Sequence, residues 1–301
     1  MEYFRNYYQN IPKAAENENG VVLDVHRFDS FRAYVDYAAR RLGFHGGSCN
    51  DASLRLDRTG WRGEGKDMLA CVELARSGWE RGRESISTFA QRITGVVGQN
   101  MIDDQPYWDH CGVEVDMDRY LTGEPECMID YREEITEGRG KVLTVAFSFD
   151  LPGFVEAEAV LLRGAMIAGL VDCLEQTGYA VELLAVSTNH QIMETQVVIK
   201  GAGEALDLDT LAFATGHAGM LRRFEFAHYE MQTGQDRAKL EVHLRYGSPM
   251  GMGKRVKADL FIPSVNDFSK KIWDKPNREE KAIEWIVEAL KEFGVGVEVK
   301  V

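Results

Sequence analysis

The sequence lacks a long apolar run. The longest, from Ala165 to Val171, is far shorter than the ~20 residues that a membrane-spanning helix needs. The N-terminal segment "MEYFRNYYQN" has no apolar stretch behind basic residues, so it does not resemble a secretory signal. We therefore expect a protein that neither spans a membrane nor carries a secretory leader.

Cysteine is scarce, and its spacing suggests no pairing. There are five cysteines, and no two of them form a CxxC pattern. An odd number of scattered cysteines indicates reduced thiols and disfavours a disulfide scaffold or a cysteine-rich zinc site. We expect a cytoplasmic protein, located in the host cytoplasm if it is viral.

The motifs of common catalytic sites are also missing. The sequence has no G-x-S-x-G elbow, HExxH pair, EF-hand loop or zinc-deaminase pattern. "RYGSPMGMGKRVK" contains Gly-Lys, but Arg255 occupies the position where a phosphate loop needs Ser or Thr. We expect no catalytic residue, cofactor or metal. Lys254 and Arg255 either lie in a hairpin loop or form a basic finger that touches a phosphate or an acidic partner.

Charge is unevenly distributed along the chain. The 301 residues are 45% apolar and carry a net charge of −13. Residues 101–160 hold 15 acidic and 4 basic groups, whereas residues 1–100 are close to neutral. The overall charge argues against a broad nucleic-acid-binding surface, and the acidic segment is suited to a basic partner.

Hydrophobic periodicity favours an α/β fold. Apolar or alternating runs predict strands near residues 21–28, 141–150, 179–187 and 193–200, with amphipathic helices between or before them. This order is typical of a three-layer sandwich with a mostly parallel, mixed sheet covered by helices on both faces. We expect an N-terminal α/β or α+β region over residues 1–140 and an α/β domain over 141–301. One continuous domain is the alternative.

The segment "KVLTVAFSFD … RGAMIAGLVDCLEQTGYAVELLAVS" resembles the first strand, first helix and second strand of a von Willebrand factor A-like domain. In that family an Asp at the end of the first strand and two spaced hydroxyl residues help to bind a divalent metal. Asp150 matches this Asp, but Pro152 and Phe154 occupy the hydroxyl positions. The resemblance therefore implies a degenerate metal site. The whole chain is also similar to uncharacterised proteins of tailed bacteriophages, which implies no function.

"GWRGEGKDMLACVELARSGWERGRESIS" places two tryptophans among glycines and arginines. One hypothesis is that each ring covers a helix end where glycine permits close approach. The alternative is an aromatic platform with basic side chains, which is how single-stranded nucleic acid is held. The nucleic-acid-binding candidates in this stretch are Trp61, Arg62, Arg76, Trp79, Arg81 and Arg83.

The segment "EVDMD" offers candidate partner-binding residues. If it forms a strand, Glu114, Asp116 and Asp118 share one face. Three carboxylates there either hold a divalent cation or form a solvated, charged edge that blocks aggregation. We favour the charged edge.

These patterns favour a non-enzymatic protein that docks a protein partner through its acidic segment. The alternative is an accessory factor that binds single-stranded DNA and recruits a phage polymerase. An enzyme would require Asp150 to meet Arg163 or Asn189 in a pocket.

Overall fold

The computed structural model describes residues 24–44, 51–56, 64–98, 105–132, 140–151, 155, 157–189, 193–232, 256–264 and 277–295. The main body contains a five-stranded sheet whose order is β1-β7-β6-β5-β8. Its strands are β1 (Asp24–Phe28), β5 (Val142–Ser148), β6 (Ala180–Asn189), β7 (Met193–Lys200) and β8 (Leu260–Ile262).

Strand pairing in this sheet is mixed but mostly parallel. β5 runs parallel to both β6 and β8, and β1 runs parallel to β7, whereas β6 and β7 are antiparallel. Val145 pairs with Leu260 on one side, and Val142 pairs with Ala180 on the other. The α/β class is thus confirmed, and the architecture is compatible with the predicted three-layer sandwich.

The helices of the body begin and end at residues that favour these boundaries. Ser30 and Asp67 accept hydrogen bonds from the first turns of α2 (Phe31–Ala39) and α3 (Met68–Ser77). Gly78, with a φ of 97°, ends α3. The 3₁₀ turn η1 (Arg40–Gly43) extends α2.

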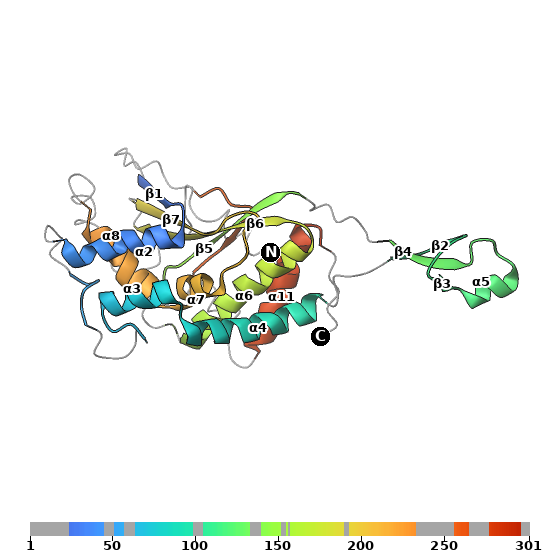
Figure 1. Ribbon diagram of the computed structural model, residues 1–301, viewed down its shortest axis with the longest axis horizontal. Helices are drawn as coiled ribbons and strands as arrows, with labels where there is room; N and C mark the ends of the chain where they lie inside the picture. Colours follow the sequence, from blue (N-terminus) through green and yellow to red (C-terminus); the bar gives the residue numbers. More distant parts are fainter. Residues whose placement is uncertain are drawn as a thin grey trace.

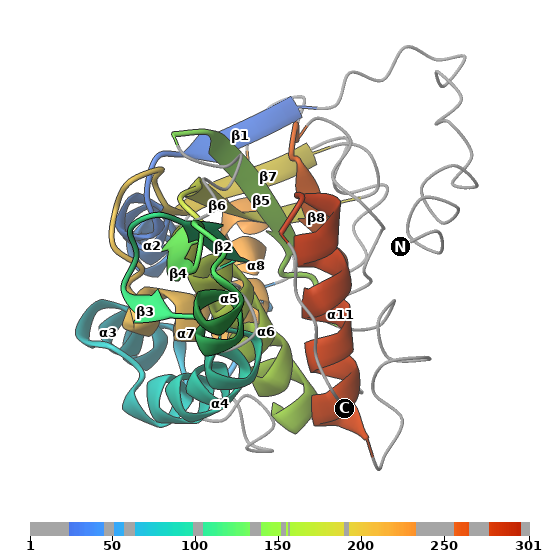
Figure 2. The ribbon, with the colours of Figure 1, turned by 90° about the vertical axis from the view of Figure 1, so that its right-hand side faces the viewer.

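Helices α2, α4 (Glu80–Gly98), α6 (Ala157–Gln176) and α7 (Leu208–Gly216) lie on one face of the sheet (Figures 1 and 2). α6 is buried along most of its length, and its Gly169 lets α4 approach closely. A Cβ atom on Gly169 would lie 2.9 Å from Ile93. α11 (Arg278–Glu292) packs against α6 and buries Trp285 and Ile286. A smaller apolar cluster around Ala146, Leu184 and Phe261 marks the opposite face.

After α7 the chain forms a π-helical turn, η2 (Met220–Glu225), and the short helix α8 (Phe226–Glu230). The sequence predicts a break near Gly216 to Gly219, and this break is confirmed. Arg223 is buried here and donates hydrogen bonds to the carbonyl oxygens of Ser53, Arg55 and Lys66. These hydrogen bonds attach η2 to two separate segments of the N-terminal part of the chain, one at Ser53 and Arg55 and the other at Lys66.

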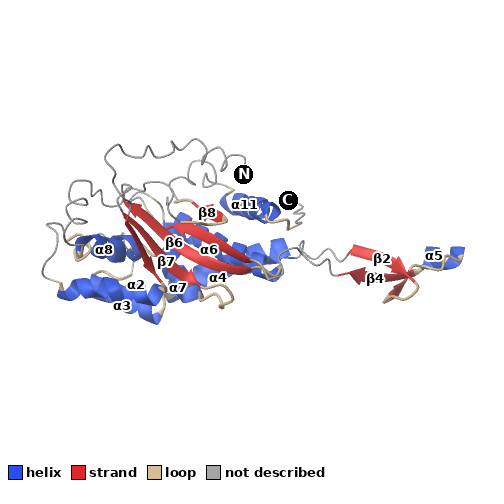
Figure 3. Cartoon of the chain, turned by 90° about the horizontal axis from the view of Figure 1, so that it is seen from above, coloured by secondary structure: helices blue, strands red, loops and turns tan. Residues whose placement is uncertain are grey.

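A second, three-stranded sheet projects from the body as an arm (Figures 1 and 3). Its strand order is β2-β4-β3, formed by β2 (Gln105–Asp109), β3 (Glu114–Val115) and β4 (Met128–Arg132). The short helix α5 (Met117–Thr122) lies between β3 and β4. We call residues 105–132 the arm.

The segment "EVDMD", which the sequence offers as a possible strand, does not form one continuous strand. β3 ends at Val115, and Asp116 then caps α5. The alternating runs "AKLEVHLRY" and "VGVEVKV" also predict strands from their sequence, but they lie largely outside the described residues. The large sheet contains strands from both sides of residue 140, because β1 pairs with β7. The predicted domain boundary stays a prediction. No helix among the described residues is long and apolar enough to cross a membrane.

Candidate partner-binding arm and buried polar network

Asp116 organises the end of the arm. Its carboxylate accepts hydrogen bonds from the backbone N–H groups of Asp118 and Arg119 and, at 2.9 Å, from the indole N–H of Trp108. The bond from the Arg119 N–H, followed by the bond from Trp108, lowers the pKa of Asp116. The Arg119 guanidinium lies 4.2 Å from the centroid of the Trp108 ring. The Asp116 carboxylate therefore joins the start of α5 to the Trp108 ring on β2.

The three predicted carboxylates do not share one strand face. Glu114 lies on β3 and Asp118 is in the first turn of α5, whereas Asp116 is occupied as the helix cap. Within the described residues, no three His, Cys, Asp or Glu side chains converge as a metal site. Glu114 and Asp118 are exposed and can contact a partner.

Large apolar side chains are unusually exposed on the arm. Val113 and Leu121 are each 75% exposed. The exposed apolar residues of the arm are Trp108, Val113, Val115, Met117, Tyr120 and Leu121. They outnumber those in the rest of the described chain, although the arm is only a small part of it. Sequence patterning missed this feature because the assumed strand alternation hid the apolar face of α5.

The arm is also acidic. It contains seven Asp and Glu residues against two arginines, a net charge of −5. The arm therefore holds seven of the fifteen acidic residues of the acidic segment predicted from the sequence.

Trp79 supports the packing hypothesis for the Trp/Arg stretch. Its side chain is only 8% exposed, and its ring meets the His217 ring edge-on at 4.8 Å. A Cβ atom on Gly82 would overlap the Trp79 ring. The glycine is thus required for the close approach that the sequence suggested.

The arginines of the Trp/Arg stretch contact different parts of the body. Arg76 pairs with Asp36 at 2.6 Å, and Arg83 pairs with Asp209 at 3.1 Å. Arg81 is exposed on α4. The structure therefore does not assemble them around an open aromatic ring. Trp61, Arg62, Lys254 and Arg255 lie outside the described residues.

A buried polar network lies where β5 and β6 end. Asp150 accepts a hydrogen bond from Ser187 at 2.7 Å, and Ser187 contacts the Tyr229 hydroxyl at 3.1 Å. Burial raises the pKa of Asp150 to about 7, and the nearby Glu225 charge adds to the rise, while hydrogen bonds from Ser187 and Ser148 oppose it. Arg163 instead donates to the carbonyl oxygen of Ser148.

Glu225 is the second buried carboxylate of this network. It accepts hydrogen bonds from Tyr34 at 2.6 Å and from Thr195 at 2.7 Å, and His228 lies 3.7 Å away. Burial alone would raise the pKa of Glu225, but the hydrogen bond and charge of His228, with the two hydroxyl donors, lower it overall. Glu225 is therefore ionised. The sequence analysis did not predict this network.

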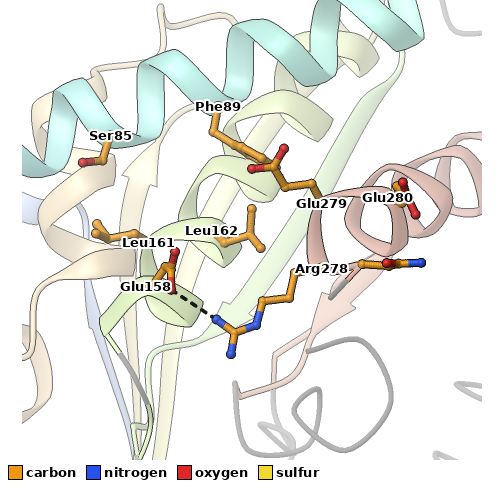
Figure 4. A pocket seen from close by; sticks show the side chains of 9 residues that line it. Ser85, Phe89, Glu158, Leu161, Leu162, Arg278, Glu279 and Glu280 are labelled. Atoms are coloured by element: carbon orange, nitrogen blue, oxygen red, sulfur yellow. Dashed lines mark hydrogen bonds and ion pairs between the residues drawn. The ribbon is translucent and has the colours of Figure 1, made fainter. Parts of the chain in front are cut away.

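A cavity of about 770 Å³ lies between α4, α6 and the start of α11 (Figure 4). Phe89, Leu161 and Leu162 supply its apolar lining. Three of the four charged residues that line it form ion pairs. Arg278 contacts Glu158 at 3.4 Å, and Glu279 pairs with Arg92 outside the lining. These pairings leave the cavity without a feature that selects a ligand, so we assign it no function.

The fold and these sites define an α/β protein with an acidic, apolar projecting arm and a buried network of carboxylates, hydroxyls and histidines. A family model described as "Domain of unknown function (DUF7192)" matches residues 15–297. The chain belongs to this family. No curated protein and no solved structure matches it.

Proposed function

We propose that this chain is a non-enzymatic interaction protein whose arm docks a protein partner. The observation that supports this proposal is the concentration of exposed apolar side chains on an acidic structure that projects from the body. Large apolar side chains gathered on a surface are typical of interaction sites, because covering them removes apolar area from water.

Helix α5 supplies the anchor of the proposed interface. Met117, Tyr120 and Leu121 are spaced i, i+3 and i+4, and therefore lie on one side of the helix. All three are more than half exposed. A helix with this pattern fits an apolar groove, and aromatic anchors such as Tyr are enriched among residues that dominate binding energy.

The carboxylates define the kind of partner. Glu114 and Asp118 are exposed beside the apolar side chains, and Glu124 follows α5. Opposite charges across an interface speed encounter and disfavour wrong partners. The partner should therefore present an apolar groove edged by lysine or arginine.

The test is affinity capture with the tagged full chain from the cells in which the protein is naturally made. A Tyr120→Ser, Leu121→Ser variant should lose the partner at least about tenfold, because burying two large side chains contributes several kcal/mol. Leu69→Ser is the matched control, since Leu69 is 53% exposed on α3 of the body. Equal recovery of every bound protein by the arm variant would contradict the proposal.

The nucleic-acid hypothesis remains a prediction. Trp79 is buried. Among the described residues, no observation favours single-stranded DNA over a protein partner. The resemblances to von Willebrand factor A-like domains and to tailed-phage proteins also remain predictions, although β5, α6 and β6 have the expected strand–helix–parallel strand order.

A further inference from the structure

Helix α5 lacks the buried contacts that normally hold a helix in a protein. It has six residues, whereas an isolated helix shorter than about 12–15 residues is at best marginally stable in water. Among residues 106–130 of the arm, no side chain is buried. The helix forms the far end of the arm (Figures 1 and 3). Contacts other than a hydrophobic core must therefore fix its position.

One carboxylate at the start of α5 makes such contacts, and each of its two oxygens has a separate task. Asp116 Oδ1 accepts hydrogen bonds from the backbone N–H groups of Asp118 and Arg119, at 3.1 and 3.2 Å. Asp116 Oδ2 accepts the indole N–H of Trp108 on β2, at 2.9 Å. The first oxygen caps the helix, and the second attaches the cap to the sheet.

The backbone of Asp116 and the side chain of Arg119 support the same attachment. The N–H group of Asp116 donates to the carbonyl oxygen of Cys127, immediately before β4, at 2.8 Å. The Arg119 guanidinium lies 4.2 Å from the centroid of the Trp108 ring, and Arg119 Nε lies 3.9 Å from Asp116 Oδ2. The Trp108 ring is thus held at its N–H and over its face by residues at the start of α5. Two contacts of different direction fix the orientation of the helix as well as its distance from β2.

This orientation bears on docking because the apolar side chains of the proposed interface follow the attachment directly in the sequence. Met117 comes after Asp116, and Tyr120 and Leu121 come after Arg119. Holding a binding segment in its bound conformation before association lowers the ordering cost of binding and raises the affinity. A contact that orders α5 in the free protein therefore strengthens the binding of a partner to α5.

We propose that Trp108 and Asp116 are the positioning residues of the docking surface: their hydrogen bond fixes the direction in which α5 presents its apolar side chains to the partner. This inference rests on the proposed function of the arm. The two residues act through α5, so the role requires no contact between either of them and the partner.

Two substitutions remove the same hydrogen bond from opposite sides. Asparagine has one side-chain oxygen, so Asp116→Asn can cap α5 or accept the Trp108 N–H, but it cannot do both. Trp108→Phe keeps an aromatic ring for Arg119 and loses the N–H donor. Glu126→Gln is the matched control, since it removes one charge from an exposed residue of the arm and leaves the side chains of the contact in place.

The first measurement is amide hydrogen exchange of residues 117–122 in the full chain, and it needs no partner. Exchange should be about five to ten times faster in Asp116→Asn and in Trp108→Phe than in the wild type, because one charge-assisted hydrogen bond is lost. It should be unchanged in Glu126→Gln. Exchange in α6 should be the same in all variants, which checks that the body folds. Wild-type exchange of α5 in Asp116→Asn or in Trp108→Phe would overturn the proposal.

The second measurement is the affinity of the same variants for the partner that the wild type captures. Asp116→Asn and Trp108→Phe should each weaken binding about five to ten times. The double variant should lose no more than the larger single effect, because both substitutions remove one hydrogen bond. Additive losses would overturn the proposal, since they would show that the two residues act through separate contacts.

Comparison with Tyr120→Ser, Leu121→Ser separates this proposal from the proposed function. If that variant loses the partner while Asp116→Asn and Trp108→Phe bind like the wild type, the docking surface stands and the positioning role alone is wrong. If that variant still captures the partner, the arm is not the docking surface, and the positioning role falls with it.

Discussion

Asp150 shows how much of a residue's behaviour comes from partners distant in sequence. It follows a buried strand, and that position could be predicted from local sequence. Its partner Ser187 comes from the next strand, and Glu225 comes from η2. The burial that raises its pKa arises only when β5, β6 and α8 meet. No local pattern could therefore have predicted a carboxylate that titrates near pH 7.

Asp150→Asn should flatten the dependence of unfolding free energy on pH. The folded-state pKa of Asp150 is raised from 3.8 to about 7, so its contribution is most favourable below pH 3.8 and is lost as pH rises through about 7. A tenfold difference in proton affinity between the folded and unfolded states is worth about 1.4 kcal/mol. The amide keeps an acceptor for Ser187, and the variant should exceed the wild type in stability by about 1–3 kcal/mol at pH 8.

Urea unfolding at several pH values between about 5 and 8 measures this effect. Asp172→Asn is the matched control, because Asp172 is an exposed aspartate on α6. Its pH profile should follow that of the wild type. A profile of Asp150→Asn that is parallel to the wild type would show that Asp150 does not titrate in this range.

At the scale of elements, the local sequence indicates where helices end better than it indicates the secondary structure of the arm. Ser30, Asp67 and Gly78 mark helix boundaries because their effects act within one turn. "EVDMD" alternates like a strand, yet the Asp116 side chain caps α5 immediately after β3. β3 has two residues and α5 has six, so neither the two-residue period of a strand nor the 3.6-residue period of a helix can be recognised in the sequence there.

Helix α4 provides a direct test of close packing. Gly82→Ala should destabilise the protein by about 1–3 kcal/mol, because the new methyl group would force the buried Trp79 ring to move. Intrinsic helix propensity acts in the opposite direction, since Ala is favoured over Gly by about 1 kcal/mol. The packing cost should exceed this gain.

Gly95→Ala is the matched control in the same helix. Gly95 is exposed, and a Cβ atom there would have no neighbour within 4 Å. This variant should gain about 0.5–1 kcal/mol, so the two substitutions should have opposite signs in thermal or urea unfolding. If Gly82→Ala were also stabilising, the close contact with Trp79 would not constrain the helix.

At the scale of the whole molecule, long-range contacts join segments that are far apart in the sequence. The sequence placed a boundary near residue 140, but β1 joins the large sheet and α4 packs against α6. Long-range strand order is invisible to periodicity, whereas the acidic bias of residues 101–160 is visible at once. That bias located the arm without revealing its shape or its exposed apolar side chains.

The arm should be removable without loss of the body. Gln105 pairs with Arg132, so the two ends of the arm lie side by side and a short Gly/Ser linker can join them. Among the described elements, the strands of the arm contact one another and have no extensive contact with the body. Replacing residues 105–132 should therefore change the Tm by no more than about 2 °C, which corresponds to less than about 1 kcal/mol for a body of this size. Calorimetry and circular dichroism measure this change, and the same protein should fail to capture the partner. A much larger fall in Tm would show that the arm supports the body, and capture of the partner without the arm would place the interface elsewhere.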